Sequence, residues 1–268
     1  MERLEKIVTE QKSLVCVGLD SDVSKLPSGV DQLGFNRAII DVTYDLVAAY
    51  KPNTAFYEAG GAAGIQVLKD TCDYIHRVAP DVLIVLDAKR ADIGNTNSGY
   101  VQFAYDYLGA DAITLHPYLG REALEPFLAR DDKGSIILCR TSNPGGGEFQ
   151  DAIVGDKKLY EHITNSVAYE WNSNKNCMLV VGATYPTEAE QIRKIAGNDV
   201  WFLVPGIGAQ GGNLQELMAA AQNSRGDGVL ISSSRDIIFA SSGLDFAEAA
   251  RRATELLRSE TNSYRKAK

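Results

Sequence analysis

Cysteine and histidine are scarce in this chain, and their scarcity limits the metal and redox chemistry open to it. The 268 residues include four cysteines and three histidines. The cysteines show no CxxC spacing and three of them lie in apolar runs, so we expect buried, reduced thiols rather than a zinc site or disulfides. The histidines share no spacing typical of metal ligands. The cysteines are Cys16, Cys72, Cys139 and Cys177, and the histidines are His76, His116 and His162.

Long apolar runs and an excess of basic residues are also missing. No apolar run reaches the roughly 18 residues that a membrane-spanning helix needs, and residues 1–6 carry no apolar targeting segment. The net charge of −8 argues against a nucleic-acid partner, because phosphate backbones require a basic surface. Binding of a small anionic ligand is still compatible with this charge, since a local cluster of cations can outweigh the electrostatic field of the whole protein. Because both a membrane-spanning run and a targeting segment are missing, we expect a cytoplasmic protein.

The apolar residues gather instead into short runs at fairly even spacing. These runs are continuous rather than alternating, which is typical of strands buried on both faces of a parallel sheet. Stretches with a helical period separate them. The runs are Ser13–Asp20, Ala49–Phe56, Val82–Lys89, Ala112–Pro117, Ser135–Ser142, Cys177–Thr184, Trp201–Gly208 and Gly228–Arg235. The helical stretches are residues 3–11, Leu33–Val47, Ala62–Val78, Gly94–Leu108, Glu122–Leu128, Asp156–Trp171, Thr187–Ile195, Asn213–Ala221 and Phe246–Leu257.

This alternation of strands and helices predicts an α/β protein with a (β/α)8 TIM-barrel fold, which typically takes about 250 residues. A doubly wound open sheet is the alternative, but the first predicted strand ends Val17-Gly18-Leu19-Asp20 with no glycine-rich fingerprint. No linker is long enough to divide the chain, so residues 1–268 are expected to form a single domain. The longest loop, Thr141–Gly155, has the length of a lid or a binding loop.

Charged residues end several predicted strands, at the place where a barrel holds its active site. One apolar run ends in Asp87, Lys89 and Asp92, and such charges are costly unless they pair or perform chemistry. Asp20 ends the first strand, and Lys51 ends the second. Two unit charges about 4 Å apart interact by roughly 4 kcal/mol at an effective dielectric of about 20. An alternating array would therefore keep the lysines protonated and the aspartates ionised; a purely structural ion-pair network is the alternative.

A second signal follows the last two predicted strands. The segment PGIGAQGGN spans residues 205–213, and Ser232, Ser233, Ser234 and Arg235 end the eighth strand. Glycines let backbone N–H groups approach an anion closely, and the loops after strands seven and eight of barrels commonly bind phosphate. Arg235 can hold a phosphate with two parallel hydrogen bonds. With Gln210 in the turn, this pattern predicts a phosphate site; the alternative is a tight turn beside a solvated arginine.

Three segments of the chain resemble the orotidine 5′-monophosphate (OMP) decarboxylase family, in its longer bacterial type. They are LDAKRADIGNT at residues 86–96, TSNP at residues 141–144 and PGIGAQGG at residues 205–212. The first segment is highly specific, and the likeness runs over nearly the whole chain. The resemblance implies a TIM-barrel carboxy-lyase that needs no cofactor and converts OMP to UMP and CO₂, the last step of de novo pyrimidine biosynthesis.

The resemblance also implies a role for each matching residue. Lys89 would stabilise the electron pair left on C6 of the pyrimidine and then protonate it. Asp87 would lie beside the departing carboxylate, while Asp20 and Lys51 would complete the charge array and bind ribose hydroxyls. The remaining implied contacts are Asp92 and Thr96 in the neighbouring subunit's site, Ser142 at the pyrimidine ring, and Gln210, Arg235 and backbone amides near Ser234 at the 5′-phosphate. The resemblance therefore implies a homodimer with shared active sites.

Two other functions stay open from the sequence. One is a Mg²⁺-dependent sugar-phosphate decarboxylase of the same barrel superfamily, such as 3-keto-L-gulonate 6-phosphate decarboxylase, which shares the Asp-x-Lys-x-x-Asp string. That relative carries a carboxylate where Lys51 stands here. Asp20, Asp87 and Asp92 could bind Mg²⁺ in principle, but the two lysines already neutralise them and favour a metal-free site. The other is a nucleotide-phosphate binder without catalytic activity.

Overall fold

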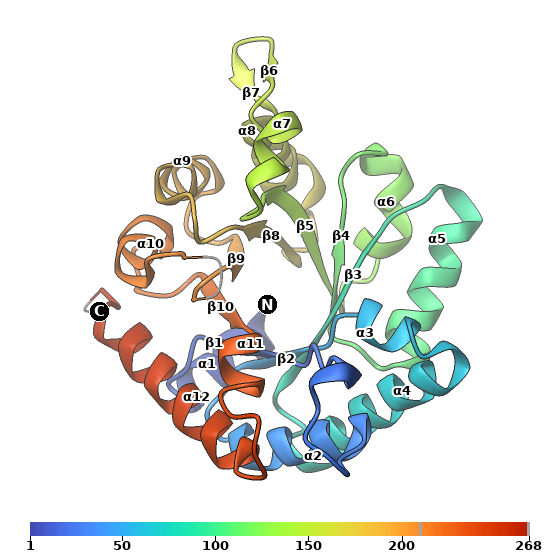
Figure 1. The fold of residues 1–268 in the computed structure, drawn as a ribbon. Helices are drawn as coiled ribbons and strands as arrows, with labels where there is room; N and C mark the ends of the chain where they lie inside the picture. The colour runs from blue at the N-terminus through green and yellow to red at the C-terminus, as the bar shows by residue number, and fades with distance from the viewer. Residues whose placement is uncertain (209–210, 267–268) are drawn as a thin grey trace.

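The computed structural model describes residues 1–208 and 211–266. Within these residues, eight parallel strands close a barrel in the order β1-β10-β9-β8-β5-β4-β3-β2 (Figure 1). The closed parallel sheet confirms the predicted (β/α)8 barrel and excludes the open sheet. The strands are β1 (Val15–Gly18), β2 (Ala49–Lys51), β3 (Leu83–Arg90), β4 (Ala112–Leu115), β5 (Gly134–Arg140), β8 (Cys177–Val181), β9 (Trp201–Pro205) and β10 (Val229–Ser233).

Helices follow the strands and form an outer ring around the barrel (Figure 1). None of those in the described ranges is long and apolar enough to cross a membrane. Two of them, α5 and α8, continue as π-helical turns, η2 (Gln102–Tyr107) and η4 (Ser166–Trp171). The helices are α1 (Glu2–Glu10), α2 (Gln32–Thr43), α3 (Ala55–Glu58), α4 (Gly61–Val78), α5 (Gly94–Val101), α6 (Gly120–Leu128), α7 (Gly147–Gln150), α8 (Leu159–Asn165), α9 (Pro186–Ala196), α10 (Leu214–Ala221), α11 (Arg235–Ile238) and α12 (Phe246–Ser263), with 3-10 turns η1 (Val23–Lys25) and η3 (Pro144–Gly146).

Burial on both faces explains why the strands read as unbroken apolar runs. Every residue of β1, β2, β4, β8 and β10 is buried, because one face of the sheet fills the barrel and the other packs against the helices. Each buried Val, Leu or Ile contributes about 1.5–3 kcal/mol relative to an exposed one. The four cysteines are buried and free, as expected. Burial raises the pKa of the Cys16 thiol, at the strand end beneath the charged residues, to about 12.

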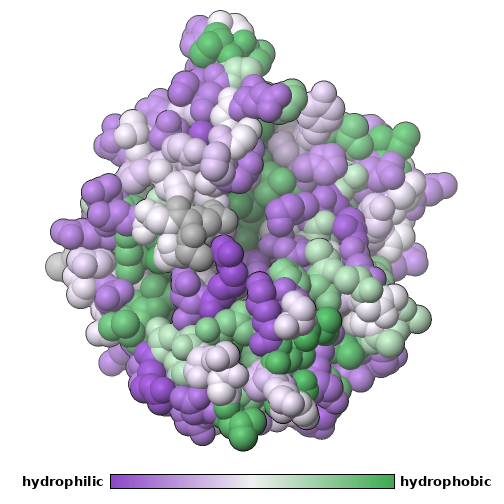
Figure 2. Space-filling view, viewed as in Figure 1, coloured by the Kyte–Doolittle hydropathy of each residue, from purple (hydrophilic) through white to green (hydrophobic). Residues whose placement is uncertain are grey.

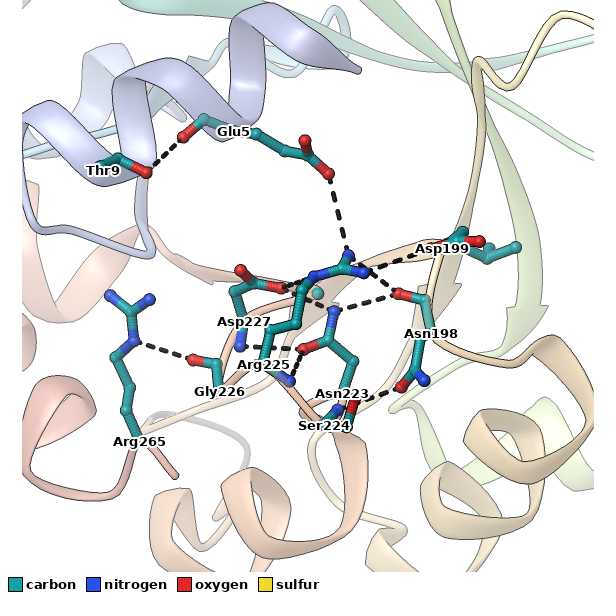
Figure 3. Close-up of polar contacts among 12 residues, drawn as sticks. Glu5, Thr9, Asn198, Asp199, Asn223, Ser224, Arg225, Gly226, Asp227 and Arg265 are labelled. Atoms are coloured by element: carbon teal, nitrogen blue, oxygen red, sulfur yellow. Dashed lines mark hydrogen bonds and ion pairs between the residues drawn. The ribbon is translucent and has the colours of Figure 1, made fainter. Parts of the chain in front are cut away.

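The amino-terminal face of the barrel is held by a polar network centred on Arg225 (Figure 3). Its guanidinium lies 3.3 Å from Asp199 and 3.5 Å from Asp227, in the loops that lead into β9 and β10, and 3.8 Å from Glu5 of α1. Arg225 is 43% exposed, so each pair contributes little by itself. The network joins α1 to the loops before β9 and β10, which fits the general role of this barrel face in stability.

The segment after β5 departs from the prediction. A helix was predicted over Asp156–Trp171, but α8 begins only at Leu159. The preceding residues form a small antiparallel hairpin, β6 (Ile153–Val154) and β7 (Lys157–Lys158), which projects from the rim at the top of Figure 1. The hairpin turns at Gly155, whose φ of 66° is a conformation that glycine adopts without strain. The predicted long loop is thus an ordered arm, made of η3, α7 and this hairpin.

Candidate active site

A cavity of about 310 Å³ opens at the carboxyl ends of the barrel strands. Figure 2 shows a hollow near the middle of this face, with hydrophilic surface along its edge and apolar surface in its depth. The volume lies in the range of small-molecule sites, about 300–1,000 Å³. Seven of the residues predicted for the site line it together: Asp20, Lys51, Asp87, Lys89, Ser142, Ser234 and Arg235.

Four charged side chains form a chain of ion pairs at one side of this cavity. Lys51 Nζ lies 3.0 Å from Asp87 Oδ2 and 3.9 Å from Asp20 Oδ1. Lys89 Nζ lies 2.5 Å from Asp87 Oδ1, so Asp87 bridges the two ammonium groups. The formal charges of the four groups cancel. The side chain of Lys51 is buried, whereas that of Lys89 is half exposed and faces the cavity.

Opposite charges decide the protonation states of this array. Burial alone raises the pKa of the Asp87 carboxyl, but Lys51 and Lys89 outweigh burial and hold that pKa well below its usual range. Burial alone lowers the pKa of the Lys51 ammonium, but Asp20 and Asp87 outweigh it and hold that pKa above its ordinary value. Asp87 is therefore ionised and Lys51 protonated at neutral pH. The Asp87 carboxylate is thus a fixed anion between two ammonium groups at the cavity.

Close backbone approaches shape the other side of the cavity. Gly18 ends β1, and a side-chain carbon built there would lie 1.8 Å from Ser234 Oγ. Glycine at this position therefore lets the segment Ser234–Arg235 pack over the end of β1. Gly206 follows β9 with a φ of 100° and also lines the cavity. The predicted phosphate contacts Ser234 and Arg235 thus face the cavity, while Gln210 lies outside the described residues.

The structure does not bring every predicted residue into the cavity. Asp92 and Thr96 lie beyond the end of β3 and do not line it, and Thr96 is exposed. The loop that carries them is ordered by Asn97, whose buried amide bonds the N–H and the carbonyl of Asp92. His116 also lies outside the cavity lining; its Nδ1 accepts a hydrogen bond from Tyr118 N at 3.3 Å. In the described ranges, no group of three or more His, Cys, Asp or Glu is placed to hold a metal ion.

The cavity also contains residues that sequence reasoning missed. Polar members are Thr114, at the middle of the predicted fourth strand, Asn143, after the fifth, and Asp236, after the eighth. The apolar wall is formed by Leu138, Val180, Leu203, Pro205 and Ile207. Their places near the carboxyl ends of β5, β8 and β9 could have identified them, because the same rim supplies the charged residues. Thr114 gives no such signal, since it stands inside an apolar run.

Arg140 fixes the arm to the end of β5 beside the cavity. Its guanidinium is buried and holds the Asp151 carboxylate in a two-point contact, with Nε–Oδ1 and Nη2–Oδ2 distances of 3.2 and 3.0 Å. The backbone N–H of Thr141 donates a hydrogen bond of 2.9 Å to Oε1 of Gln150, which belongs to the same arm. Ser142 follows directly, and its backbone packs so closely on Gly182 that a side-chain carbon there would lie 2.4 Å from Ser142 N. These contacts set the position of Ser142 at the cavity.

Comparisons with known proteins agree with this geometry. Residues 13–253 match the model of the "Orotidine 5'-phosphate decarboxylase / HUMPS family". An orotidine 5′-phosphate decarboxylase of Azoarcus sp. (strain BH72) is 44% identical over 270 residues, covering 99% of each protein.

The chain belongs to the orotidine 5′-phosphate decarboxylase family.

Solved structures agree with this membership. The OMP decarboxylase of Leishmania donovani superposes with a TM-score of 0.87 at 36% identity, over 99% of this chain and 98% of that one. The UMP synthase of Leishmania donovani superposes with a TM-score of 0.88 at 38% identity, and this chain spans 98% of its own length but 56% of that protein. Family membership makes this chain a carboxy-lyase, as the resemblance implied. It also favours an enzyme over a protein that only binds nucleotides.

Proposed function

We propose that this chain decarboxylates OMP to UMP and CO₂ without a metal or an organic cofactor. The observation that carries the proposal is the position of Lys89 Nζ, 2.5 Å from the Asp87 carboxylate in a cavity of nucleotide-binding size. An ammonium held there stabilises negative charge as it develops on the substrate. The names of the related proteins, orotidine 5′-phosphate decarboxylases, support the choice of substrate.

The proposed reaction needs one bond cleavage and one proton transfer. The bond between C6 of the pyrimidine and its carboxylate carbon breaks, CO₂ leaves, and the electron pair stays on C6 in the plane of the ring. Lys89 Nζ stabilises that pair and donates a proton to C6; the neutral amine then regains a proton from solvent. Asp87, beside Lys89, is proposed to repel the substrate carboxylate, and that repulsion disappears as neutral CO₂ forms. We rank this destabilisation below stabilisation of the carbanion.

The rest of the cavity is proposed to bind the parts of the nucleotide that do not react. Asp20 and Lys51 bind ribose hydroxyls, and Ser142 contacts the pyrimidine ring. The 5′-phosphate is bound by Arg235, by backbone amides near Ser234 and by Gln210. Binding energy from the phosphate can then be used to position the ring against Lys89.

The active unit is proposed to be a cytoplasmic homodimer of single-domain subunits, in which Asp92 and Thr96 complete the partner's site. Both residues lie outside the cavity of their own subunit. Ile93, between them, is 62% exposed, which suits a surface covered by a second subunit. Asn97 holds the loop in shape before any partner binds.

The proposal is tested by following ultraviolet absorbance as OMP is added to the purified chain in buffer containing EDTA. We expect turnover of OMP with no added metal, loss of turnover in Lys89→Met, and unchanged turnover in Lys194→Met, which removes an exposed lysine on α9. Failure of wild-type protein to convert OMP would reject the substrate. Decarboxylation of a keto-sugar phosphate that EDTA abolishes and Mg²⁺ restores, in the absence of OMP turnover, would instead favour the metal-dependent sugar-phosphate decarboxylase. Binding of UMP without any turnover would favour the binder.

A further inference from the structure

The strand that carries Lys89 is irregular where the lysine leaves it. The pairing of β3 with β4 runs from Leu86 opposite Ile113 to Arg90 opposite Leu115. Three residues of β3, 87–89, therefore face a single residue of β4, which is Thr114. A bulge of this kind breaks the ladder of backbone hydrogen bonds and redirects the side chains that it carries.

Thr114 replaces the hydrogen bonds that the bulge removes. Its Oγ1 accepts from Ala88 N at 3.0 Å and from Lys89 N at 2.9 Å. Lys89 has a φ of 47°, a left-handed conformation that is strained for any residue other than glycine. Strained backbone persists only where surrounding contacts hold it in place. The two N–H bonds to Thr114 supply such contacts at the residue that bears the proposed proton donor.

The same hydroxyl also fixes the carboxylate beside the lysine. Because both lone pairs of Thr114 Oγ1 accept N–H bonds, its single proton is free to be donated, and it points to Asp87 Oδ1 at 2.9 Å. That oxygen is also the partner of Lys89 Nζ. Thr114 is only 2% exposed, so water does not compete for these bonds. One hydroxyl group thus sets both the backbone of Lys89 and the anion that orients its ammonium.

We propose that Thr114 is a positioning residue for Lys89, acting through the bulge and through the Asp87 carboxylate. The proposal rests on the proposed decarboxylase activity and deepens it by adding a residue on the neighbouring strand. Thr114 Oγ1 acts by holding the reacting groups rather than by reacting. Its loss therefore lowers the rate of the chemical step and leaves the proposed phosphate contacts of Ser234 and Arg235, on the other side of the cavity, in place.

The test is a comparison of Thr114→Val with Thr114→Ser in the full-length protein, measuring kcat and KM for OMP and the Kd for UMP. Valine keeps the shape of threonine but removes every hydrogen bond, whereas serine keeps the hydroxyl. Misplacing a catalytic group by about 1 Å can cost roughly 100-fold in rate, so we expect a fall in kcat of about that size for Thr114→Val. We expect KM and the Kd for UMP to stay within about threefold, and Thr114→Ser to recover most of kcat.

Thr254→Val is the matched control, because Thr254 is fully buried on α12 and its hydroxyl donates one hydrogen bond to Ala250 O. We expect it to leave kcat unchanged. If Thr114→Val does not fold, Thr114→Ala is compared with Thr114→Ser by the same measurements. A Thr114→Val protein with wild-type kcat, or an equal loss in Thr114→Ser, overturns the inference. A wild-type protein that does not convert OMP overturns the proposed function instead, so the two failures are distinguishable.

Discussion

Replacing Lys51 with methionine tests whether the charge array also holds the barrel together. Methionine keeps most of the side-chain volume and removes only the ammonium. The ammonium of Lys51 is buried and lies between two carboxylates, 3.0 Å from Asp87 and 3.9 Å from Asp20. Without it, Asp87 keeps the half-exposed Lys89 as its partner of opposite charge and the hydrogen bond from Thr114, and Asp20 loses its ion pair with Lys51.

The magnitude follows from the burial of the group that is removed. Breaking a buried ion pair by deleting one partner costs about 3–5 kcal/mol, because the remaining charge is left without compensation. For a chain of this size, each kcal/mol changes Tm by about 2–4 °C, so Lys51→Met is expected to lower Tm by roughly 6–20 °C at pH 7. The assay is urea unfolding followed by circular dichroism, with the thermal melt as a second measurement.

A second change separates charge from packing. Asp87→Asn added to Lys51→Met removes the more deeply buried of the two carboxylates that lose Lys51, and we expect it to restore more than half of the lost unfolding free energy. Lys69→Met is the control, because Lys69 pairs with the half-exposed Asp73 on the surface of α4 and should lose less than about 1 kcal/mol. A loss in Lys51→Met as small as that of the control, or no recovery in the double variant, refutes the reasoning.

Three further results are expected. Arg235→Ala removes charge-assisted hydrogen bonds worth about 1.5–3 kcal/mol, so KM for OMP should rise roughly 10- to 100-fold while kcat changes little in steady-state assays. The pKa of Asp87 is lower in the folded protein than its value of about 3.9 in the unfolded chain, so ionised Asp87 stabilises the fold above about pH 4 and this stabilisation is lost progressively as pH falls towards the folded pKa. The difference in unfolding free energy between wild-type protein and Asp87→Asn should therefore be constant above about pH 4 with respect to this group and shrink steadily below it. Mixing inactive Asp92→Asn and Lys89→Met subunits should restore activity if sites are shared, and a mixture that stays inactive argues against the shared dimer site.

The architecture of the barrel could be predicted because its strands obey a simple physical rule. Strands buried on both faces are expected to be apolar throughout, and β1 and β8 are. Charged residues at the ends of such strands are rare enough to mark the active-site rim. The array of Asp20, Lys51, Asp87 and Lys89 was predicted on that ground, and the structure brings its members together.

The features that were missed depend on local backbone geometry rather than on residue type. The hairpin at residues 153–158 was assigned partly to a helix because its residues continue the periodicity of α8. The Gly155-Asp156 pair between short runs was a usable turn signal that the helical period concealed. Thr114 could not be identified, because its contacts arise from the shifted register of β3 on β4, which no side-chain pattern encodes.

The central claim is that Lys89 stabilises an electron pair on C6 and delivers a proton to it. Proton exchange at C6 of UMP, followed by NMR in D₂O, measures that step without any departing CO₂, because the reverse of protonation creates the same carbanion. The account predicts that wild-type protein replaces the C6 hydrogen of UMP with deuterium and that Lys89→Met does not, although it still binds UMP. Exchange at the wild-type rate in Lys89→Met would contradict it.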